Sequence, residues 1–237
     1  MPRVFVTGDT HGSMELKRLS HRNFPIGRGL TKDDIVIICG DCGFMWDFSN
    51  ETKWWDDWAG NLNFTIVGVL GNHENYDVIR ALPTEEWNGA IVRKVRPSIM
   101  YVENGEIFTF NNKKFFVFGG ANSTDKMYRK EGVSWWEEEM PSYTEMWHAA
   151  DNLENVNWKV DYVLTHTCCN SVIDTIDKWS PRHDTLTSFL EKRINSSLEF
   201  KYWFSGHMHI DQTVNDKYIM LYNDILEITD DGLNMCN

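Results

Sequence analysis

The sequence has little positive charge. It contains 23 lysine and arginine residues against 35 aspartate and glutamate residues, so its formal net charge is −12 over 237 residues. Proteins that bind nucleic acid through broad electrostatic attraction have the opposite balance, because their basic side chains must neutralise phosphates. The composition therefore excludes a general nucleic-acid-binding protein.

Long apolar runs and a disulfide framework are lacking as well. No apolar run approaches the ~20 residues that a membrane span requires. The opening residues "MPRVFVTGD" lack the charged segment and apolar core of a secretory signal. The five cysteines are an odd number, which fits free thiols in a reducing compartment better than paired disulfides. We therefore expect a cytoplasmic protein with no membrane partner.

One cysteine pair has the spacing of a redox or zinc motif. Cys39 and Cys42 lie at the ends of the sequence "CGDC", which matches C-x-x-C. No second pair with this spacing follows, and Cys39 ends the apolar run "IVIIC". The preferred interpretation is therefore a pair of buried thiols.

Short apolar runs that end in glycine or a polar residue recur along the chain. The clearest are "RVFVTGDTHG", "DIVIICGDCG", "FTIVGVLGNHE", "KFFVFGGANS", "DYVLTHTC" and "KYWFSGHMH". The early runs are continuous rather than alternating, which predicts strands buried on both faces. No repeat, low-complexity tract or linker separates the runs, so we expect residues 1–237 to form a single domain with two sheets.

The spacing of polar residues predicts parallel strands. Asp9, Asp41 and His73 follow three of the apolar runs at intervals of 32 residues. An interval of about 30 residues accommodates a strand, a crossover helix and the next parallel strand. We expect helices over residues 13–22, 50–60 and 74–82. In the later sequence "SIMYVENGEIFTFNNKKFFVFGG", the residues "NNKK" predict a hairpin turn between strands.

Two segments, residues 44–60 and 133–159, hold most of the 11 tryptophans. One interpretation is a cap whose aromatic rings stack on a base or a sugar. The other is a pair of amphipathic helices that place tryptophan on the core and carboxylates in solvent. The helical spacing of Trp54, Trp55 and Trp58 favours the second interpretation.

Polar side chains gather where the predicted strands end. They comprise two carboxylates, one amide and five of the eight histidines: Asp9, His11, Asp41, Asn72, His73, His166, His207 and His209. In open α/β sheets, ligands bind at the carboxyl ends of the strands. One histidine at such a place would be structural, but five beside two carboxylates are hard to explain as packing. The remaining histidines are interpreted as surface residues.

The stretch "WFSGHMHID" carries two of these histidines one residue apart. In an extended segment, His207 and His209 point to the same side, so both rings can reach one point. The nitrogen and oxygen donors suit Mn²⁺, Fe, Zn²⁺ or Ni²⁺. Without His73, seven candidate ligands still exceed the needs of one ion, and a bridging carboxylate can hold two. We therefore predict two divalent metal ions, with Mn²⁺ preferred.

The ordered motifs resemble those of the calcineurin-like metallophosphoesterases. They are D-x-H (Asp9, His11), G-D (Gly40, Asp41), G-N-H-E (Gly71 to Glu74), a single His166 after a strand, and G-H-x-H (Gly206 to His209). The motifs occur in that family's order and extend over residues 8–209. The resemblance implies an α/β fold with four α-β-β-α layers, in which two mixed sheets flanked by helices carry a dinuclear site at one edge.

The resemblance also implies a role for each residue. Asp9, His11, Asp41 and His209 would bind the first metal, and Asp41, Asn72, His166 and His207 the second. Asp41 would bridge the two ions, and a bridging hydroxide would attack phosphorus in line. His73 would lie near the leaving group and, as an imidazolium, stabilise or protonate the departing oxygen. Asp41 and His73 are thus the predicted catalytic residues.

One motif departs from the pattern of the protein phosphatases in this family. Their sequence G-D-x-V-D-R-G corresponds here to "GDCGFMW", with Phe44 and Met45 in place of the second Asp and the phosphate-binding Arg. We expect Phe44 and Trp46 to contact an apolar part of the substrate. Glu74 or Asp47 could orient His73, and Arg129 or Arg182 could hold the phosphate, but the preferred interpretation of each of the four is a surface salt-bridging residue.

The predicted activity is therefore that of a phosphatase or phosphodiesterase acting on small phosphate esters or nucleotide-like substrates. Nucleic acid enters only as a substrate, because bound cations would reverse the local field. A Ser/Thr-type protein phosphatase is the alternative within the family. A non-catalytic metal-binding scaffold is disfavoured because every ligand position is filled. An amidohydrolase-like barrel would need H-x-H after the first strand, where this chain has D-x-H.

Overall fold

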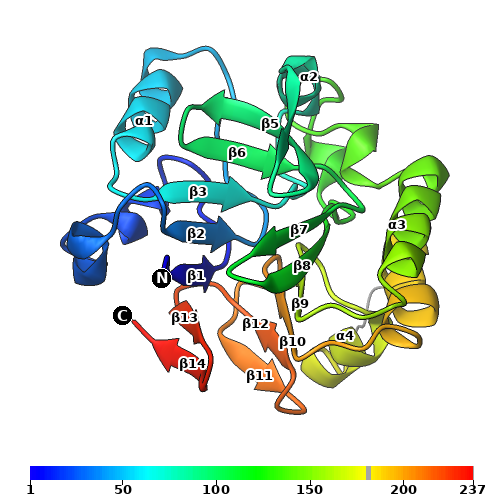
Figure 1. The fold of residues 1–237 in the computed structure, drawn as a ribbon. Coiled ribbons are helices and arrows are strands. Elements are labelled where there is room, and N and C mark those ends of the chain that lie inside the picture. Colours follow the sequence, from blue (N-terminus) through cyan, green and yellow to red (C-terminus); the bar gives the residue numbers. More distant parts are fainter. Residues whose placement is uncertain (180–182, 237) are drawn as a thin grey trace.

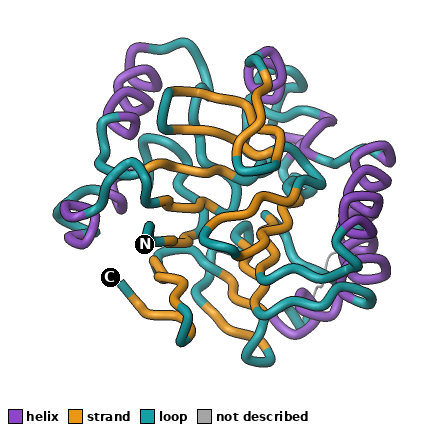
Figure 2. Tube along the Cα trace, in the orientation of Figure 1, coloured by secondary structure: helices purple, strands orange, loops and turns teal. Residues whose placement is uncertain are grey.

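Two mixed β-sheets lie face to face in the computed structural model, which describes residues 1–179 and 183–236. The strands occupy the centre and the helices lie on the outside (Figures 1 and 2). The predicted α/β sandwich of two mixed sheets flanked by helices is confirmed. The N- and C-terminal ends lie near one another, because the strand order of the larger sheet places β13 between β1 and β14.

The larger sheet has the strand order β14-β13-β1-β2-β3-β6-β5-β4. Its strands are β1 (Val4–Thr7), β2 (Ile35–Ile38), β3 (Thr65–Gly68), β4 (Thr84–Trp87), β5 (Ala90–Arg96), β6 (Ile99–Val102), β13 (Ile225–Thr229) and β14 (Gly232–Met235). Strands β1, β2, β3 and β6 are parallel to their neighbours in this group. The 32-residue spacing thus correctly predicted the parallel pairing of β1, β2 and β3.

The smaller sheet has the strand order β11-β12-β10-β9-β8-β7. Its strands are β7 (Ile107–Phe110), β8 (Lys113–Phe118), β9 (Tyr162–Thr165), β10 (Tyr202–Ser205), β11 (Gln212–Val214) and β12 (Tyr218–Met220). The predicted hairpin joins β7 to β8 through Asn111 and Asn112, whose φ angles of 50° and 59° are positive. Asparagine tolerates this conformation better than most residues, which explains the tight turn.

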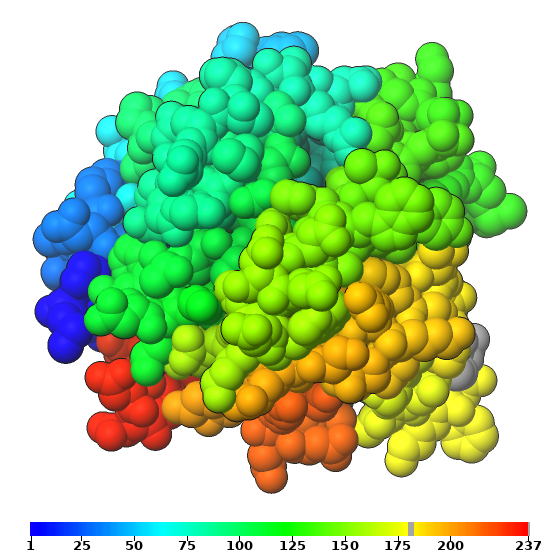
Figure 3. Space-filling view, turned by 45° about the vertical axis from the view of Figure 1, so that its right-hand side comes forward, coloured from blue at the N-terminus to red at the C-terminus, as the bar shows by residue number. Residues whose placement is uncertain are grey.

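Helices cover the outer face of each sheet (Figure 1). The larger sheet carries α1 (Asn50–Gly60) and α2 (Tyr76–Ala81), and the smaller sheet carries α3 (Tyr143–Asn155), α4 (Asn170–Ile176) and α5 (Thr185–Phe189). In the space-filling view, the yellow-green side chains of α3 form a continuous ridge over the smaller sheet (Figure 3). Within residues 1–179 and 183–236, no helix combines the length and the apolar character that crossing a membrane requires.

Alternation along the strands explains the layers. In β1, Val4 and Val6 belong to the apolar cluster between the sheets, whereas Phe5 packs beneath the helices of the larger sheet. In β8, Val117 faces the other sheet and Phe118 faces the outer helices. Both faces of these strands are buried, so their sequences are continuously apolar. The core is therefore divided into three apolar layers.

One prediction of local structure was wrong, and several short strands were missed. The expected helix over residues 13–22 is a short 3₁₀ helix, Leu16–Leu19, and a second 3₁₀ helix, Pro25–Gly29, continues the crossover. The apolar residues Leu16 and Leu19 of the first 3₁₀ helix are fully buried. The apolar spacing that predicted a longer helix therefore reflects their packing in the core. The short strands β4, β5 and β11 to β14 were not predicted. Strand β4 is mostly exposed, so no apolar run marks it.

The tryptophan-rich segments only partly form the expected amphipathic helices. In α1, Trp55 and Trp58 pack against the core, but Trp54 remains 57% exposed. In α3, Trp147 is 70% exposed and lies away from the core. The assignment of tryptophan to the core is therefore correct for one face of α1 and wrong for α3.

Candidate metal centre

The loops that follow five parallel strands meet at one edge of the two sheets. Asp9, Asp41 and Asn72 follow β1, β2 and β3 of the larger sheet, while His166 and His207 follow β9 and β10 of the smaller one. Backbone hydrogen bonds tie the first two loops together, because the amides of residues 10 and 11 both donate to the carbonyl of residue 41. The strand ends thus bring distant segments into one place.

Contacts between the sheets complete this edge. The backbone N–H of His207 donates to Asp9 Oδ1 at 2.9 Å, and His209 Nε2 lies 3.0 Å from Asp9 Oδ2. His166 Nδ1 donates to the carbonyl of Cys39 at 2.8 Å. Each of these contacts joins the larger sheet to the smaller one, so neither sheet alone could form the site.

The polar side chains form two adjoining groups of potential metal ligands. Asp9, His11 and His209 make one group, and Asp9, Asp41 and His166 make the other, with the ligand atoms of each group within 4.8 Å of one another. Asp41 faces both groups. Its Oδ2 lies 3.3 Å from His11 Nε2, and its Oδ1 lies 3.3 Å from His166 Nε2. Its two oxygens are thus positioned like those of a bridging carboxylate.

The remaining predicted ligands, Asn72 and His207, lie beside His166. Asn72 Oδ1 lies 2.9 Å from His166 Nε2. The ring of His207 lies 4.9 Å from that of His166, measured between centroids. On the opposite side, the ring of His209 lies 5.1 Å from that of His11. The structure therefore brings all seven predicted ligands to one edge, with His207 beside His166 and His209 beside His11.

The donor set suits cations. Because the carbonyl of Cys39 can only accept, His166 Nδ1 carries a proton, and in the neutral ring Nε2 then presents a lone pair. This lone pair faces oxygens of Asn72 and Asp41. Asp9 Oδ2 is buried and has no hydrogen-bond partner among the described residues, although His209 Nε2 is near. Lone pairs that converge in this way are arranged as ligands of shared cations.

The electrostatics of the site also favour the binding of cations. Burial would lower the pKa of His166, but the neighbouring carboxylates of Asp41 and Asp9 raise it to about 9. Burial raises the pKa of Asp41, but His166 and His11 outweigh it and hold this pKa well below the usual range. Burial and the neighbouring His166 lower the pKa of His207 to about 4. The field therefore attracts positive charge, while His207 offers a neutral nitrogen.

The backbone of the site differs from the extended segment that the sequence predicted. His207 and His209 have φ angles of 63° and 50°, so both lie in the left-handed region. His11 and Asp41 do so as well, with φ angles of 40° and 48°. This conformation is uncommon for residues other than glycine and is concentrated at functional sites. The reasoning from an extended strand was wrong, although both histidines do reach the site.

Two glycines of the motifs allow close approach. A Cβ atom on Gly40, whose φ angle is 92°, would lie 2.1 Å from His166 Nδ1. A Cβ atom on Gly206 would lie 2.1 Å from Asp9 Oδ1. Any side chain at either position would therefore displace a potential ligand.

Several supporting residues were missed by the sequence analysis. Glu15 lies 3.1 Å from His11 Nδ1, and Tyr222 stacks on the ring of His209. Ser123 accepts a hydrogen bond from Asn72 and donates to Glu139, a fully buried carboxylate. Such contacts orient metal ligands. No sequence signal separates Glu139 from the two glutamates that precede it.

His73 lies beside both groups but belongs to neither. Its ring centroid is 5.5 Å from that of His11, and its backbone N–H donates to Asp41 Oδ1 at 2.7 Å. Arg129 Nη2 lies 2.8 Å from His73 Nε2 and 3.0 Å from Nδ1. Burial is the largest effect on the pKa of His73 and, with Arg129 as a further cause, lowers it. The ring therefore favours the neutral form over the expected imidazolium.

The residues suggested as partners of His73 are placed elsewhere. Glu74 is fully buried and accepts hydrogen bonds from the Cys42 amide and the Tyr101 hydroxyl. Burial and Asp41 raise the pKa of Glu74 to about 8. Asp47 lies just before α1 and accepts hydrogen bonds from the Ser49 amide and the Thr52 hydroxyl. Neither carboxylate orients His73.

The two arginines suggested as phosphate ligands have different outcomes. Arg129 does form a salt bridge, with Asp125 at 2.8 Å, but its side chain is only 15% exposed and it also contacts His73. The interpretation as a surface residue was therefore incomplete. Arg182 lies outside the described residues.

The two residues that depart from the protein-phosphatase pattern do not form a substrate surface together. Phe44 is 1% exposed and packs against Tyr101 in the core, so the expected contact with substrate was wrong. Met45 packs against the same core cluster, and its backbone N–H faces Asp56. Trp46, by contrast, lines a cavity next to His11 and His73.

Comparison with known proteins identifies a family. A family model described as calcineurin-like phosphoesterase matches residues 2–211. No protein of curated function has significant sequence similarity to this chain.

Three solved structures align with this chain at low sequence identity. GAP50, the anchor in the inner membrane complex of Plasmodium, aligns with a TM-score of 0.55 at 13% identity, over 99% of this chain and 83% of that chain. Phosphopantetheinyl hydrolase from Mycobacterium tuberculosis aligns with a TM-score of 0.42 at 16% identity, over 94% and 90%. A cold-active protein-tyrosine phosphatase from a psychrophilic Shewanella species aligns with a TM-score of 0.40 at 12% identity, over 100% and 81%.

Proposed function

The chain belongs to the calcineurin-like phosphoesterase family of metal-dependent phosphoric ester hydrolases with dinuclear metal centres, and on this basis we propose that it hydrolyses small phosphate mono- or diesters at the candidate metal centre. The observation that carries the proposal is the position of Asp41, whose two carboxylate oxygens face His11 and His166 on opposite sides. A carboxylate in this position can hold two cations at the spacing that phosphate ester hydrolysis requires.

The described residues fit two cations. Asp9, His11, Asp41 and His209 would hold the first cation, and Asp41, Asn72, His166 and His207 the second. The mixed nitrogen and oxygen donors suit Mn²⁺ best, with Fe, Zn²⁺ and Ni²⁺ as alternatives. When bound, the cations would activate water and neutralise charge on the phosphoryl oxygens. Because both sheets supply ligands, we treat residues 1–237 as one domain.

The residues beside the metal ligands would act on the substrate directly. We assign His73 to the leaving group, where a ring N–H would donate to the departing oxygen. We assign Arg129 to the phosphoryl oxygens, because its guanidinium reaches the site at His73. Met45 replaces the arginine of the protein-phosphatase pattern, so Arg129 would supply that charge from a different loop.

We propose small esters, rather than phosphoproteins, as substrates. The support is a cavity of about 370 Å³ that adjoins His11 and His73 and is lined in part by Trp46 and Trp55. A cavity of this size encloses a small alcohol group better than a peptide segment. We expect kcat/KM for small esters to exceed that for phosphoserine peptides by at least ~10-fold.

A panel of substrates tests the function. Purified protein loaded with Mn²⁺ would be assayed with phosphomonoesters, phosphodiesters and phosphoserine peptides, with metal content measured in the same samples. Asp41→Asn is the matched inactive control. Hydrolysis of small esters by the wild type alone supports the proposal. Preferential dephosphorylation of the peptides would favour the protein-phosphatase alternative, and metal binding without any hydrolysis would favour a scaffold.

We also propose a cytoplasmic location. All five cysteines are free in the structure, and four of them are buried. Unpaired thiols persist in a reducing compartment. Microscopy of a fluorescent fusion in the source cells would test the location, and an extracytoplasmic signal would contradict it.

A further inference from the structure

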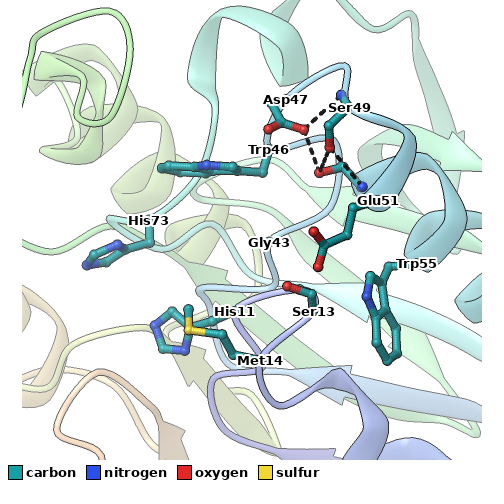
Figure 4. A pocket seen from close by; sticks show the side chains of 12 residues that line it. His11, Ser13, Met14, Gly43, Trp46, Asp47, Ser49, Glu51, Trp55 and His73 are labelled. Atoms are coloured by element: carbon teal, nitrogen blue, oxygen red, sulfur yellow. Dashed lines mark hydrogen bonds between the residues drawn. The ribbon is translucent and has the colours of Figure 1, made fainter.

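A cavity of about 370 Å³ opens beside the candidate metal centre (Figure 4). His11 and His73 form part of its wall. When the phosphate of an ester binds at the metal centre, another part of the same ester would therefore reach into the cavity. The rest of the wall comes from residues 12–14, the loop after β2 and the first turns of α1, including Trp46, Glu51 and Trp55. The cavity is thus the place where the alcohol portion of an ester would lie.

Two tryptophans give the cavity firm aromatic walls. Trp46 packs edge-on against Trp136, with ring centroids 5.8 Å apart. Trp55 is held between Trp54 and Trp58, at centroid distances of 4.9 and 5.3 Å. Trp46, Glu51 and Trp55 all line the cavity, and Figure 4 draws Glu51 between the two rings in this view. These packed rings lose little freedom when a ligand binds.

The charge of the cavity is negative. Asp47 and Glu51 line it, and no lysine or arginine does so within the described part of the chain. Asp47 is already used, because it accepts hydrogen bonds from Ser49 and Thr52. Glu51 forms no hydrogen bond or ion pair with any described residue. It is therefore an acceptor available to a ligand.

An indole face attracts a cation by ~0.5–2 kcal/mol, more when water is excluded. A nearby carboxylate adds Coulomb attraction, whereas a second phosphate on the substrate would be repelled. We propose that this cavity binds a positively charged alcohol portion of the substrate, an amino or quaternary ammonium group, between Trp46, Trp55 and Glu51. This inference rests on the proposed phosphoesterase function. Hydrolysis would break the P–O bond to this alcohol, with water supplying the hydroxyl left on phosphorus and the proton taken by the alcohol.

A matched pair of substrates isolates the charge. Phosphocholine and 3,3-dimethylbutyl phosphate have nearly the same shape, but the quaternary nitrogen of the first is carbon in the second. Homologues with three and four methylene groups extend the charge further into the cavity. For at least one chain length, we expect kcat/KM of the cationic ester to exceed that of its neutral isostere by ~10-fold or more, about 1.4 kcal/mol.

Variants of the cavity test which residues recognise the charge. Glu51→Gln and Trp55→Leu should each reduce this preference to less than ~3-fold. Trp147→Leu and Glu154→Gln, both on α3 and outside the cavity, are the matched controls and should retain it. A preference that survives both Glu51→Gln and Trp55→Leu would overturn the proposal, as would equal or better turnover of the neutral isosteres.

A binding measurement separates this inference from the proposed function. Hydrolysis of p-nitrophenyl phosphate reports phosphoesterase activity without a cationic alcohol. Calorimetric titration of the Mn²⁺-loaded His73→Ala variant, which should keep its metals but hydrolyse esters slowly, reports recognition of each member of the substrate pairs with little turnover. If p-nitrophenyl phosphate is not hydrolysed but the cationic esters bind ~10-fold tighter than their isosteres, the function fails and the cavity assignment stands. If p-nitrophenyl phosphate is hydrolysed and the pairs bind equally, the cavity assignment fails alone.

Discussion

The guanidinium of Arg129 lies against the imidazole of His73, with Nη2 2.8 Å from Nε2 and 3.0 Å from Nδ1. The two residues are 56 positions apart in the sequence. His73 follows β3 of the larger sheet, and Arg129 follows β8 of the smaller sheet. Asp125 holds the guanidinium through a 2.8 Å hydrogen bond to Nε. A fixed positive charge therefore lies beside the metal ligands, although the motif position usually occupied by arginine is Met45.

Replacing Arg129 should slow turnover without removing metal. Charge-assisted hydrogen bonds contribute ~1.5–3 kcal/mol, so we expect Arg129→Ala to lower kcat/KM for a small ester by about 10- to 100-fold. Arg129→Lys should recover part of this loss, because it restores charge but not the forked geometry. Arg22→Ala, an exposed arginine, is the control. Unchanged kinetics in Arg129→Ala would refute its role at the phosphate.

Chelation should abolish activity. We expect nearly two divalent ions per chain in the active protein, measured by elemental analysis, because two groups of ligands adjoin at Asp41. Treatment with EDTA should remove both, and Mn²⁺ should restore activity best among the ions tested. Full hydrolysis by metal-free protein would rule out the mechanism.

Substitutions at Asp41 and at His73 should have different effects on metal binding and turnover. Asp41→Asn should reduce metal occupancy, because the amide carries no charge to share between two cations. His73→Ala should leave both metals bound and slow turnover by about 10²–10⁴-fold, because the departing oxygen would lose its hydrogen-bond donor. This loss should be smaller for p-nitrophenyl esters, whose leaving group needs little stabilisation. Loss of metal in His73→Ala would show that it is a ligand instead.

The thiol of Cys42 should be dispensable. Cys42 is fully buried and its Sγ lies 3.7 Å from the carbonyl oxygen of Val69, away from the grouped ligands. Cys42→Ser preserves this contact, so metal content and kcat/KM should stay close to those of the wild type. Elemental analysis that found one ion fewer in this variant would mean that the thiol contributes to the centre.

Asp56 should make stability depend on pH. Burial raises its folded-state pKa to about 6, above the unfolded value of 3.8, with Arg96 3.8 Å away. The folded state therefore binds the proton more tightly, and stability from this group rises as pH falls from above 6 to below 4. Asp56→Asn keeps an acceptor for the Met45 amide but removes the buried charge.

The difference between wild type and Asp56→Asn measures this effect, because metal loss at low pH affects both proteins. We expect the variant to be more stable in urea unfolding by ~1–3 kcal/mol at pH 7.5, and the difference to shrink by pH 4.5. Asp57→Asn, its exposed neighbour, should change stability by less than ~0.5 kcal/mol. A wild type that is the more stable protein at pH 7.5 would contradict the predicted sign.

The sequence by itself determined the order and chemical type of the ligands. Continuous apolar runs mark strands buried on both faces, and the residues after them follow at the spacing of parallel crossovers. Because parallel strands present their carboxyl ends at the same edge, local pattern was enough to gather Asp9, Asp41 and Asn72. The same reasoning predicted the class of fold but missed exposed edge strands such as β4, whose pairing depends on a neighbour rather than on burial.

Only the tertiary structure decided which atoms face one another. The family resemblance had already assigned His207 and His209 to different metals, but only the structure shows that both residues have a left-handed backbone and not the extended one that the sequence predicted. Arg129 reaches His73, Phe44 turns into the core, and Trp46 and Trp55 enclose a cavity. Each outcome depends on packing between segments distant in sequence. Periodicity reports whether a side chain is buried, and not which side chain it meets.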